Sequence, residues 1–221
     1  VTIPNSNLEI VGLSAQDYIA AANIVGSQNF ALSAYSDNFN FGANNFTYEV
    51  WINFNTAATD GTTLIRQPVI FDTRNSNSDT LNPMLVLWQE TDTNFCTLLY
   101  GTGNATGALL TTKMSSSVKL KAGIWYHIAI CRNNSLGTTL YINGEKTGFF
   151  DDRNITYNSK YFVMGKNAYN ASGKFIGYFA DLRISNTSKY SGEYFEVSKT
   201  KLTSSTDTVL LSLRDSLYKD D

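Results

Sequence analysis

The feature that most constrains the fold of this chain is a nine-residue stretch, residues 46–54, in which two kinds of side chain alternate. One face carries Phe46, Tyr48, Val50, Ile52 and Phe54, and the other carries Thr47, Glu49, Trp51 and Asn53. A period of two is typical of a β-strand with one buried face. We therefore predict a strand whose apolar face points into the core, with Trp51 covering a second layer or lining a groove.

Short strand candidates recur along the rest of the chain, separated by loops of Asn, Ser, Asp, Thr and Gly. They lie at residues 64–71, 84–88, 95–100, 118–120, 161–164, 174–185 and 208–213. The clearest hairpin spans residues 138–147, because the pair Asn143-Gly144 accepts the positive φ angles of a type I′ turn. Only residues 15–25 predict a helix, with Ser14 as its cap.

The composition supports a single large β domain. Hydrophobic residues make up 43% of the 221 residues and charged residues only 16%, which excludes a disordered, highly charged tail. Because β-sandwiches often reach about 200–250 residues, one domain is the simplest interpretation. We predict an all-β, two-sheet antiparallel jelly-roll β-sandwich. It is expected over residues 28–215, after a lead-in or linker segment at 1–27 and before a charged tail at 216–221.

Charge and hydropathy limit the partners. The chain has 17 Lys and Arg against 19 Asp and Glu, so we expect no nucleic-acid binding through a basic face. No apolar run reaches the roughly 18 residues of a membrane span, so we expect no membrane insertion. The chain begins at Val1 without a signal-like segment, and we interpret it as a fragment of a longer protein or as a processed chain.

The two cysteines, Cys96 and Cys131, each lie in an apolar, strand-like stretch. Buried free thiols that behave as small hydrophobic side chains are the first interpretation. A disulfide between neighbouring strands is the alternative, which sequence spacing alone leaves open.

Four stretches in a fixed order carry a resemblance to a known family. They are FNFG with NFTYEVW (39–42 and 45–51), WYHIAICR (125–132), LYING (140–144), and FIGYFADLRI (175–184), which Lys189-Tyr190 follows shortly after. Together they resemble the concanavalin A-like lectin/glucanase superfamily in its laminin G-like branch. The fourth stretch is most similar to versions in bacteriophage and other viral structural proteins, such as tail fibres and virion surface components.

The resemblance implies a structural role for six residues. These are Trp125 and His127 in one strand, Asn143 and Gly144 in the hairpin, and Asp181 and Arg183 in a late strand. It also implies a non-enzymatic viral module on a capsid, fibre or tail, which assembles with itself or with other virion proteins and attaches to host glycans. The alternative is a carbohydrate-binding module of a secreted or cell-surface protein. The expected location is the particle surface or, alternatively, the extracellular space.

The residues argue against catalysis. His127 is the only histidine and lies within an apolar strand, so we expect it to bond a backbone carbonyl rather than to act in a Ser-His-Asp or Cys-His catalyst. The Glu-x-Asp-x-x-Glu pattern of glucanases is missing around Glu49, and Glu90 with Asp92 lacks a third acid. A glycosidase would need acids from separate strands, such as Glu49 and Glu90, to converge.

Aromatic residues beside amides are the carbohydrate-binding candidates, because an aromatic face stacks on a sugar ring while an amide bonds its hydroxyls. The candidates are Trp88 with Gln89, Tyr100 with Asn104, and Tyr169 with Asn167. We expect no cofactor other than calcium, which the resemblance implies at a loop rim. Its candidate ligands are Asp151 and Asp152 after the hairpin, together with Asp72 and Asp92.

Overall fold

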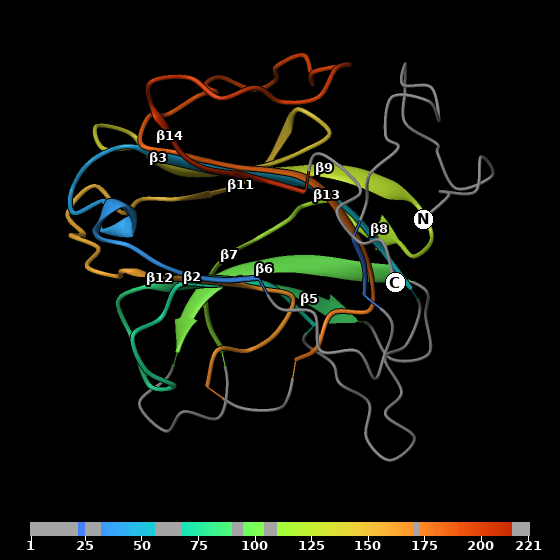
Figure 1. Ribbon diagram of the computed structural model, residues 1–221, viewed down its shortest axis with the longest axis horizontal. Coiled ribbons are helices and arrows are strands. Elements are labelled where there is room, and N and C mark those ends of the chain that lie inside the picture. The colour runs from blue at the N-terminus through green and yellow to red at the C-terminus, as the bar shows by residue number, and fades with distance from the viewer. Residues whose placement is uncertain are drawn as a thin grey trace, which may run out of the picture.

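A computed structural model describes residues 22–24, 32–55, 68–89, 95–103, 110–169 and 173–213. Figure 1 shows two β-sheets stacked as layers, which we call sheet A and sheet B. Every strand pair within these ranges is antiparallel. The predicted all-β, two-sheet antiparallel sandwich is confirmed.

Sheet A has β3, the period-two stretch, near its centre. Its order is β1 (Ala22–Ile24), β13 (Gly177–Ser185), β3 (Phe46–Phe54), β9 (Trp125–Asn133), β10 (Gly137–Ile142) and β11 (Glu145–Phe150), while β14 (Thr208–Ser212) pairs with β13. In the β3–β9 register Val50 faces Ile128 and Trp51 faces His127. This register places the apolar faces of both strands on the same side.

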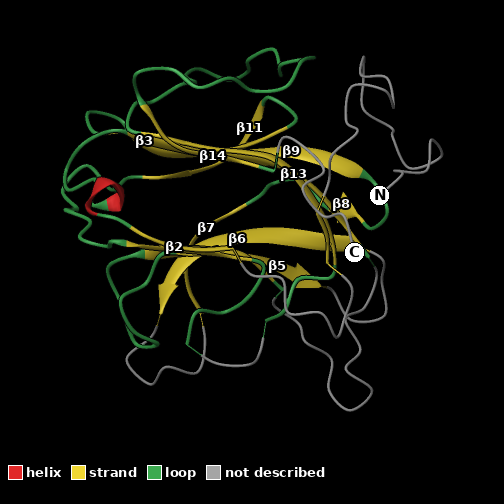
Figure 2. Cartoon of the chain, in the orientation of Figure 1, coloured by secondary structure: helices red, strands yellow, loops and turns green. Residues whose placement is uncertain are grey.

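Sheet B forms the second layer. Its order is β2 (Leu32–Tyr35), β12 (Tyr161–Met164), β4 (Val69–Asp72), β5 (Pro83–Gln89), β6 (Phe95–Gly103) and β7 (Leu110–Ser115), while β8 (Leu120–Lys121) pairs with β6. Helix is confined to η2 (Asp37–Phe39) within the described ranges, as Figure 2 shows. No described helix has the length and apolar character needed to cross a bilayer.

The core between the sheets is built largely from aromatic rings. The predicted inner face of β3 lies there. Tyr48 stacks on Phe71 and Phe162 from sheet B, with ring centroids 4.9 and 5.8 Å apart. Contacts of this kind between strands far apart in sequence hold the two layers together.

The helix prediction for residues 15–25 is wrong at Ala22–Ile24, which form strand β1 and pair with β13. The rest of that segment lies outside the described residues. Pairing with the edge of β13 outweighs a local helical preference, which is only a weak prior. β1 also lies within the segment that we expected to be a lead-in.

The connection from β13 to β14, residues 186–207, crosses the outer face of sheet A. We call it the strap, and Figure 1 shows it above the upper layer. Tyr190 and Phe195 of the strap pack on a buried cluster of Ala129, Cys131 and Tyr141. The outer face of sheet A is therefore partly a second, smaller core.

The two cysteines are free and buried. Cys96 belongs to the core between the sheets, whereas Cys131 lies beneath the strap on the outer face of sheet A. The interpretation as buried thiols is confirmed, and the disulfide alternative is wrong, since the two residues lie in different layers.

Candidate functional site

Three partly exposed tyrosines gather at one end of sheet B. Tyr35 and Tyr161 are cross-strand partners on β2 and β12, with ring centroids 5.0 Å apart. Their neighbours Ala34 and Phe162 turn inward to the core, so the pleat points the two tyrosines outward. Tyr169 follows β12 in the next loop. We call Tyr35, Tyr161 and Tyr169 the tyrosine cluster, and their side chains are 64%, 43% and 38% exposed.

Tyr169 is held in place from three sides. Its hydroxyl donates to the backbone carbonyl of Arg74, and its backbone N–H donates to Asn167 Oδ1 at 2.9 Å. The Arg74 guanidinium lies 5.8 Å from the ring centroid. Burial of the hydroxyl, followed by the Asp72 carboxylate, raises the pKa of Tyr169 to about 12, and Tyr161 adds to the shift. The phenol is therefore neutral at physiological pH and keeps its hydrogen bond to the Arg74 carbonyl.

A buried ion pair supports this end of the sheet. Arg74 Nη2 lies 2.8 Å from Asp72 Oδ2, and both side chains are almost fully enclosed. The same carboxylate oxygen accepts the Ala168 N–H at 3.0 Å, and Arg74 Nη2 also donates to Asn167 Oδ1 at 3.3 Å. These bonds tie the loop that carries Asn167 and Tyr169 to strand β4.

Amide side chains line the neighbouring loop. Asn158 Oδ1 accepts from the side-chain amides of Asn75 and Asn82, at 2.9 and 2.8 Å. Asp79 organises the loop. Burial alone would raise its pKa, but backbone N–H donors, first that of Asn75, and the Asn82 amide lower it. Asn75 and Asn158 are exposed, so polar groups fixed by hydrogen bonds adjoin the exposed rings.

A match to a family model identifies the superfamily of this chain. A family model described as the concanavalin A-like lectin/glucanases superfamily, Laminin G type 3, matches residues 23–193, which is more than half of the chain. The chain belongs to this superfamily.

Solved structures share the concanavalin A-like fold at low sequence identity. A candidate carbohydrate-binding protein from Bacteroides ovatus has a TM-score of 0.55 and 16% identity, covering 89% of this chain and 52% of its own. The binding domain of botulinum neurotoxin serotype G has a TM-score of 0.50 and 14% identity, covering 77% and 40%. Likeness at these identities shows the fold alone, and this chain spans about half of the Bacteroides chain. A search of the curated proteins found no match.

The carbohydrate-binding candidates from the sequence have different surroundings in this concanavalin A-like domain. Asn167 and Tyr169 meet, as described above. Trp88 is 37% exposed and is the cross-strand partner of Thr97. It lies four residues along β5 from Met84, which pairs with Asp72, so about 13 Å of strand separates Trp88 from the Asp72 end of the sheet. Tyr100 is buried in the core at 1% exposure, so its ring cannot contact a surface ligand. The Gln89 side chain and Asn104 lie outside the described residues.

Sequence reasoning missed Tyr35, Tyr161 and Arg74. The alternation within YFVM at 161–164 carried a signal for Tyr161, since its neighbour Phe162 is the apolar residue that turns inward. Tyr35 and Arg74 gave no such signal, because only strand pairing and the loop path bring them beside Tyr161 and Tyr169.

We expected His127 to bond a backbone carbonyl, but in the structure it bonds the Glu49 carboxylate. His127 Nε2 lies 3.3 Å from Glu49 Oε2, and both side chains are almost completely buried. Glu49 also pairs with Arg183, whose Nη2 is 2.6 Å from Oε1, and accepts from the Tyr190 hydroxyl at 2.6 Å. We call Glu49, His127, Arg183 and Tyr190 the Glu49 cluster. It joins three strands to the strap.

The other residues that match the family's pattern are buried, form a turn or bond the backbone. Trp125 is 2% exposed. Asn143 and Gly144 have φ angles of 52° and 84°, as a type I′ turn requires. Asp181 has a φ of 53°, and its Oδ2 accepts the Leu202 N–H at 2.9 Å, which fastens the strap to β13.

Three of the four carboxylates considered for calcium face an arginine. Asp152 Oδ2 lies 3.3 Å from Arg132 Nε and accepts from Thr138 and Tyr157, while Asp151 pairs with Arg153 at 2.8 Å. Asp72 pairs with Arg74, and Asp92 lies outside the described residues. No group of three His, Cys, Asp or Glu side chains suited to a metal occurs in the described ranges. Calcium binding at Asp151 and Asp152 therefore stays a prediction that this geometry does not favour.

Proposed function

We propose that this domain is a non-catalytic module that binds carbohydrate through the tyrosine cluster. The observation that carries the proposal is a set of three exposed tyrosines bordered by amide groups, in which Tyr169 is held by hydrogen bonds and Tyr35 packs edge-on against Tyr161. A sugar ring presents an apolar C–H face and a rim of hydroxyls, which match aromatic faces and amides. Because Arg74, Asp72 and Asn167 hold Tyr169 before any ligand arrives, little ordering entropy opposes binding.

The surroundings of Glu49 support a non-catalytic role. The acid is enclosed and ion-paired with Arg183, so its carboxylate has no access to a substrate. The second acid that we considered, Glu90, lies outside the described residues.

The proposed setting is the surface of a viral particle, where the module would serve assembly and host-glycan attachment. The support is the resemblance of residues 175–184 to viral structural proteins. The alternative setting is a secreted or cell-surface protein, and the candidate carbohydrate-binding relative from Bacteroides ovatus supports it equally. Carbohydrate binding is common to both.

The test of carbohydrate binding is a glycan array, followed by calorimetry on the best ligand. We expect Tyr161→Ala and Tyr169→Ala each to weaken binding by about fivefold, since aromatic stacking contributes on the order of 1 kcal/mol. Tyr194→Ala is the matched control, because Tyr194 is 80% exposed but lies on the strap. An array without signal, or equal losses in all three variants, would overturn the proposal.

The setting is tested separately. A viral structural module should form a stable oligomer by gel filtration and occur at fixed stoichiometry in purified particles by mass spectrometry. A monomer at high concentration that is missing from particles would leave the secreted or cell-surface alternative.

A further inference from the structure

A pocket of about 630 Å³ lies on sheet A, in the other layer from the tyrosine cluster. It opens at the tip of the β10–β11 hairpin, between the strap, β3, β9 and the turn that precedes β8. Its apolar walls are Trp51, Val118, Tyr126, Ile142, Phe195 and Val197. This size falls within the roughly 300–1,000 Å³ range of small-molecule sites.

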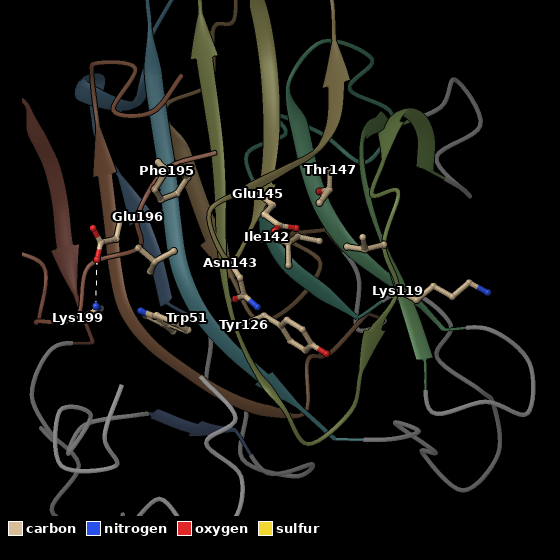
Figure 3. Close-up of a pocket in the computed structure, with 12 residues that line it drawn as sticks. Trp51, Lys119, Tyr126, Ile142, Asn143, Glu145, Thr147, Phe195, Glu196 and Lys199 are labelled. Carbon is tan, nitrogen blue, oxygen red and sulfur yellow. Dashed lines mark ion pairs between the residues drawn. The ribbon is translucent and has the colours of Figure 1, made fainter. Parts of the chain in front are cut away.

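Asn143 lies between Trp51 and Tyr126 at the centre of the pocket (Figure 3). Its backbone N–H donates to the His127 carbonyl at 2.8 Å, and its Oδ1 accepts the His127 N–H at 2.9 Å. Both bonds fix the orientation of the side-chain amide. With Oδ1 committed to the strand, the Nδ2 group is the part of the amide that remains to donate to a ligand.

The aromatic side chains at the pocket are fixed as well. Trp51 is 2% exposed and packs edge-on against His127, with ring centroids 5.2 Å apart, so it supports the pocket from beneath and does not stack on a ligand. Tyr126, on the opposite face of β9, is partly exposed, and its hydroxyl accepts the Lys121 N–H at 2.9 Å. The Asn143 amide and the Tyr126 ring are therefore preorganised at one opening, which lowers the entropic cost of binding.

The charges at the rim are balanced. Lys119 and Lys199 are matched by Glu145 and Glu196, and Lys199 Nζ lies 3.3 Å from Glu196 Oε1. A phosphate or another multiply charged ligand would meet like charge at this rim as often as opposite charge. A neutral ligand with an apolar face and several hydroxyls would contact the walls through that face and the rim groups through its hydroxyls.

We propose that this pocket binds a neutral sugar residue, as a second site separate from the tyrosine cluster. The inference rests on the proposed function for the class of ligand, but not for the position of the site. Two sites on different layers would let one module hold two branches of a glycan or link two chains. Engagement of both would raise the apparent affinity for a multivalent glycan without any new contact.

The test uses methyl pyranosides of glucose, galactose, mannose, xylose, fucose and N-acetylglucosamine as probes. Two-dimensional amide NMR follows the side-chain amide of Asn143 and the indole N–H of Trp51. We expect at least one glycoside to shift both signals in a saturable manner. Val118→Trp, which fills the mouth, should weaken this binding by about tenfold or more.

The matched control is Leu136→Trp, which places the same ring on another exposed aliphatic position, 62% exposed, in the β9–β10 turn. This control and Tyr161→Ala should leave the Asn143 and Trp51 shifts unchanged. Glu145→Gln provides a second pocket variant should Val118→Trp fold poorly, and we expect it to weaken binding severalfold.

Three outcomes overturn the inference. Glycosides could shift only signals near the tyrosine cluster, could shift no signal, or could shift the pocket signals equally in the native chain and both pocket variants. The first leaves the proposed function standing, because the array and Tyr161→Ala test it independently. A silent array overturns the proposed function, even if a glycoside shifts the Asn143 signal.

Discussion

At the residue scale, Glu49 shows how strongly tertiary contacts change the meaning of one side chain. In the sequence it stands on the polar face of a strand, where an exposed position is the simplest expectation. In the fold it accepts from Arg183 and Tyr190 and lies beside His127. Removing one partner of a buried ion pair costs far more than an exposed pair contributes, because the remaining charge stays uncompensated.

Glu49→Gln should lower the free energy of unfolding by about 3–5 kcal/mol near neutral pH. Burial alone would raise the pKa of Glu49, but the hydrogen bond and charge of His127, the charge of Arg183 and the Tyr190 hydroxyl lower it below its ordinary value of 4.5. A depressed folded-state pKa contributes stability above the unfolded-state pKa and loses it as the pH falls through the folded-state value.

Urea titrations across the acid range measure this effect. The native chain should lose stability more steeply than Glu49→Gln as the pH falls below about 4.5. Parallel curves for the two proteins would mean that Glu49 is not ionised and paired in the folded state.

Asn143→Val should also destabilise the fold, by about 2–3 kcal/mol, through strain at positive φ and a lost hydrogen bond. Asn143→Gly is the matched control, because glycine adopts the φ of 52° without strain and removes only the side-chain bond to the His127 N–H. We expect it to cost about 1 kcal/mol. Equal unfolding midpoints for the two variants would show that strain at this turn is unimportant.

At the element scale, the strap covers part of the outer face of sheet A. Tyr190 stacks on Phe195, Lys189 N–H donates to Thr47 Oγ1 at 2.9 Å, and Phe195 N–H donates to the Gly144 carbonyl at 2.8 Å. The strap makes few strand-type hydrogen bonds, however. Segments with few such bonds open locally more readily than central strands.

We therefore expect Cys131 to react with a thiol reagent before Cys96 under native conditions. Cys131 is covered by the strap, and burial raises its pKa to about 12 despite the Thr47 hydroxyl that opposes the shift. Cys96 packs in the core between the sheets, so we expect it to react only when the sheets separate. Timed alkylation with peptide mass spectrometry measures both rates, and equal rates would contradict local opening of the strap. Full reaction of both thiols in urea is the control.

At the scale of the whole molecule, one continuous core joins the two sheets. Contacts between segments far apart in the chain dominate, so we expect the sandwich to unfold as one cooperative unit. Neither sheet has an inner apolar face that could remain stable in water without the other.

Trp125→Ala tests this cooperativity. Trp125 is 2% exposed and packs beside Tyr178, with ring centroids 6.2 Å apart. We expect a loss of about 3–5 kcal/mol in the free energy of unfolding, as for other large-to-small changes at buried sites. Circular dichroism and fluorescence of the remaining tryptophans should report the same lowered midpoint. Two separate transitions would show that the sheets unfold independently.

The sequence by itself determined most of the strands, the β10–β11 turn and the fold class, because these follow from local rules. It missed β1, β2 and β7. Side-chain alternation in β3 sets which face is buried, and Asn143-Gly144 sets the turn, each within a few residues of chain. Tertiary structure alone decided that Ala22–Ile24 pair with β13, that Tyr100 is buried, and that Glu49 meets Arg183 and Tyr190. It also decided that Tyr35, Tyr161 and Tyr169 share one surface. Such meetings depend on strand order and loop path across long stretches of chain, which no local pattern of side chains encodes.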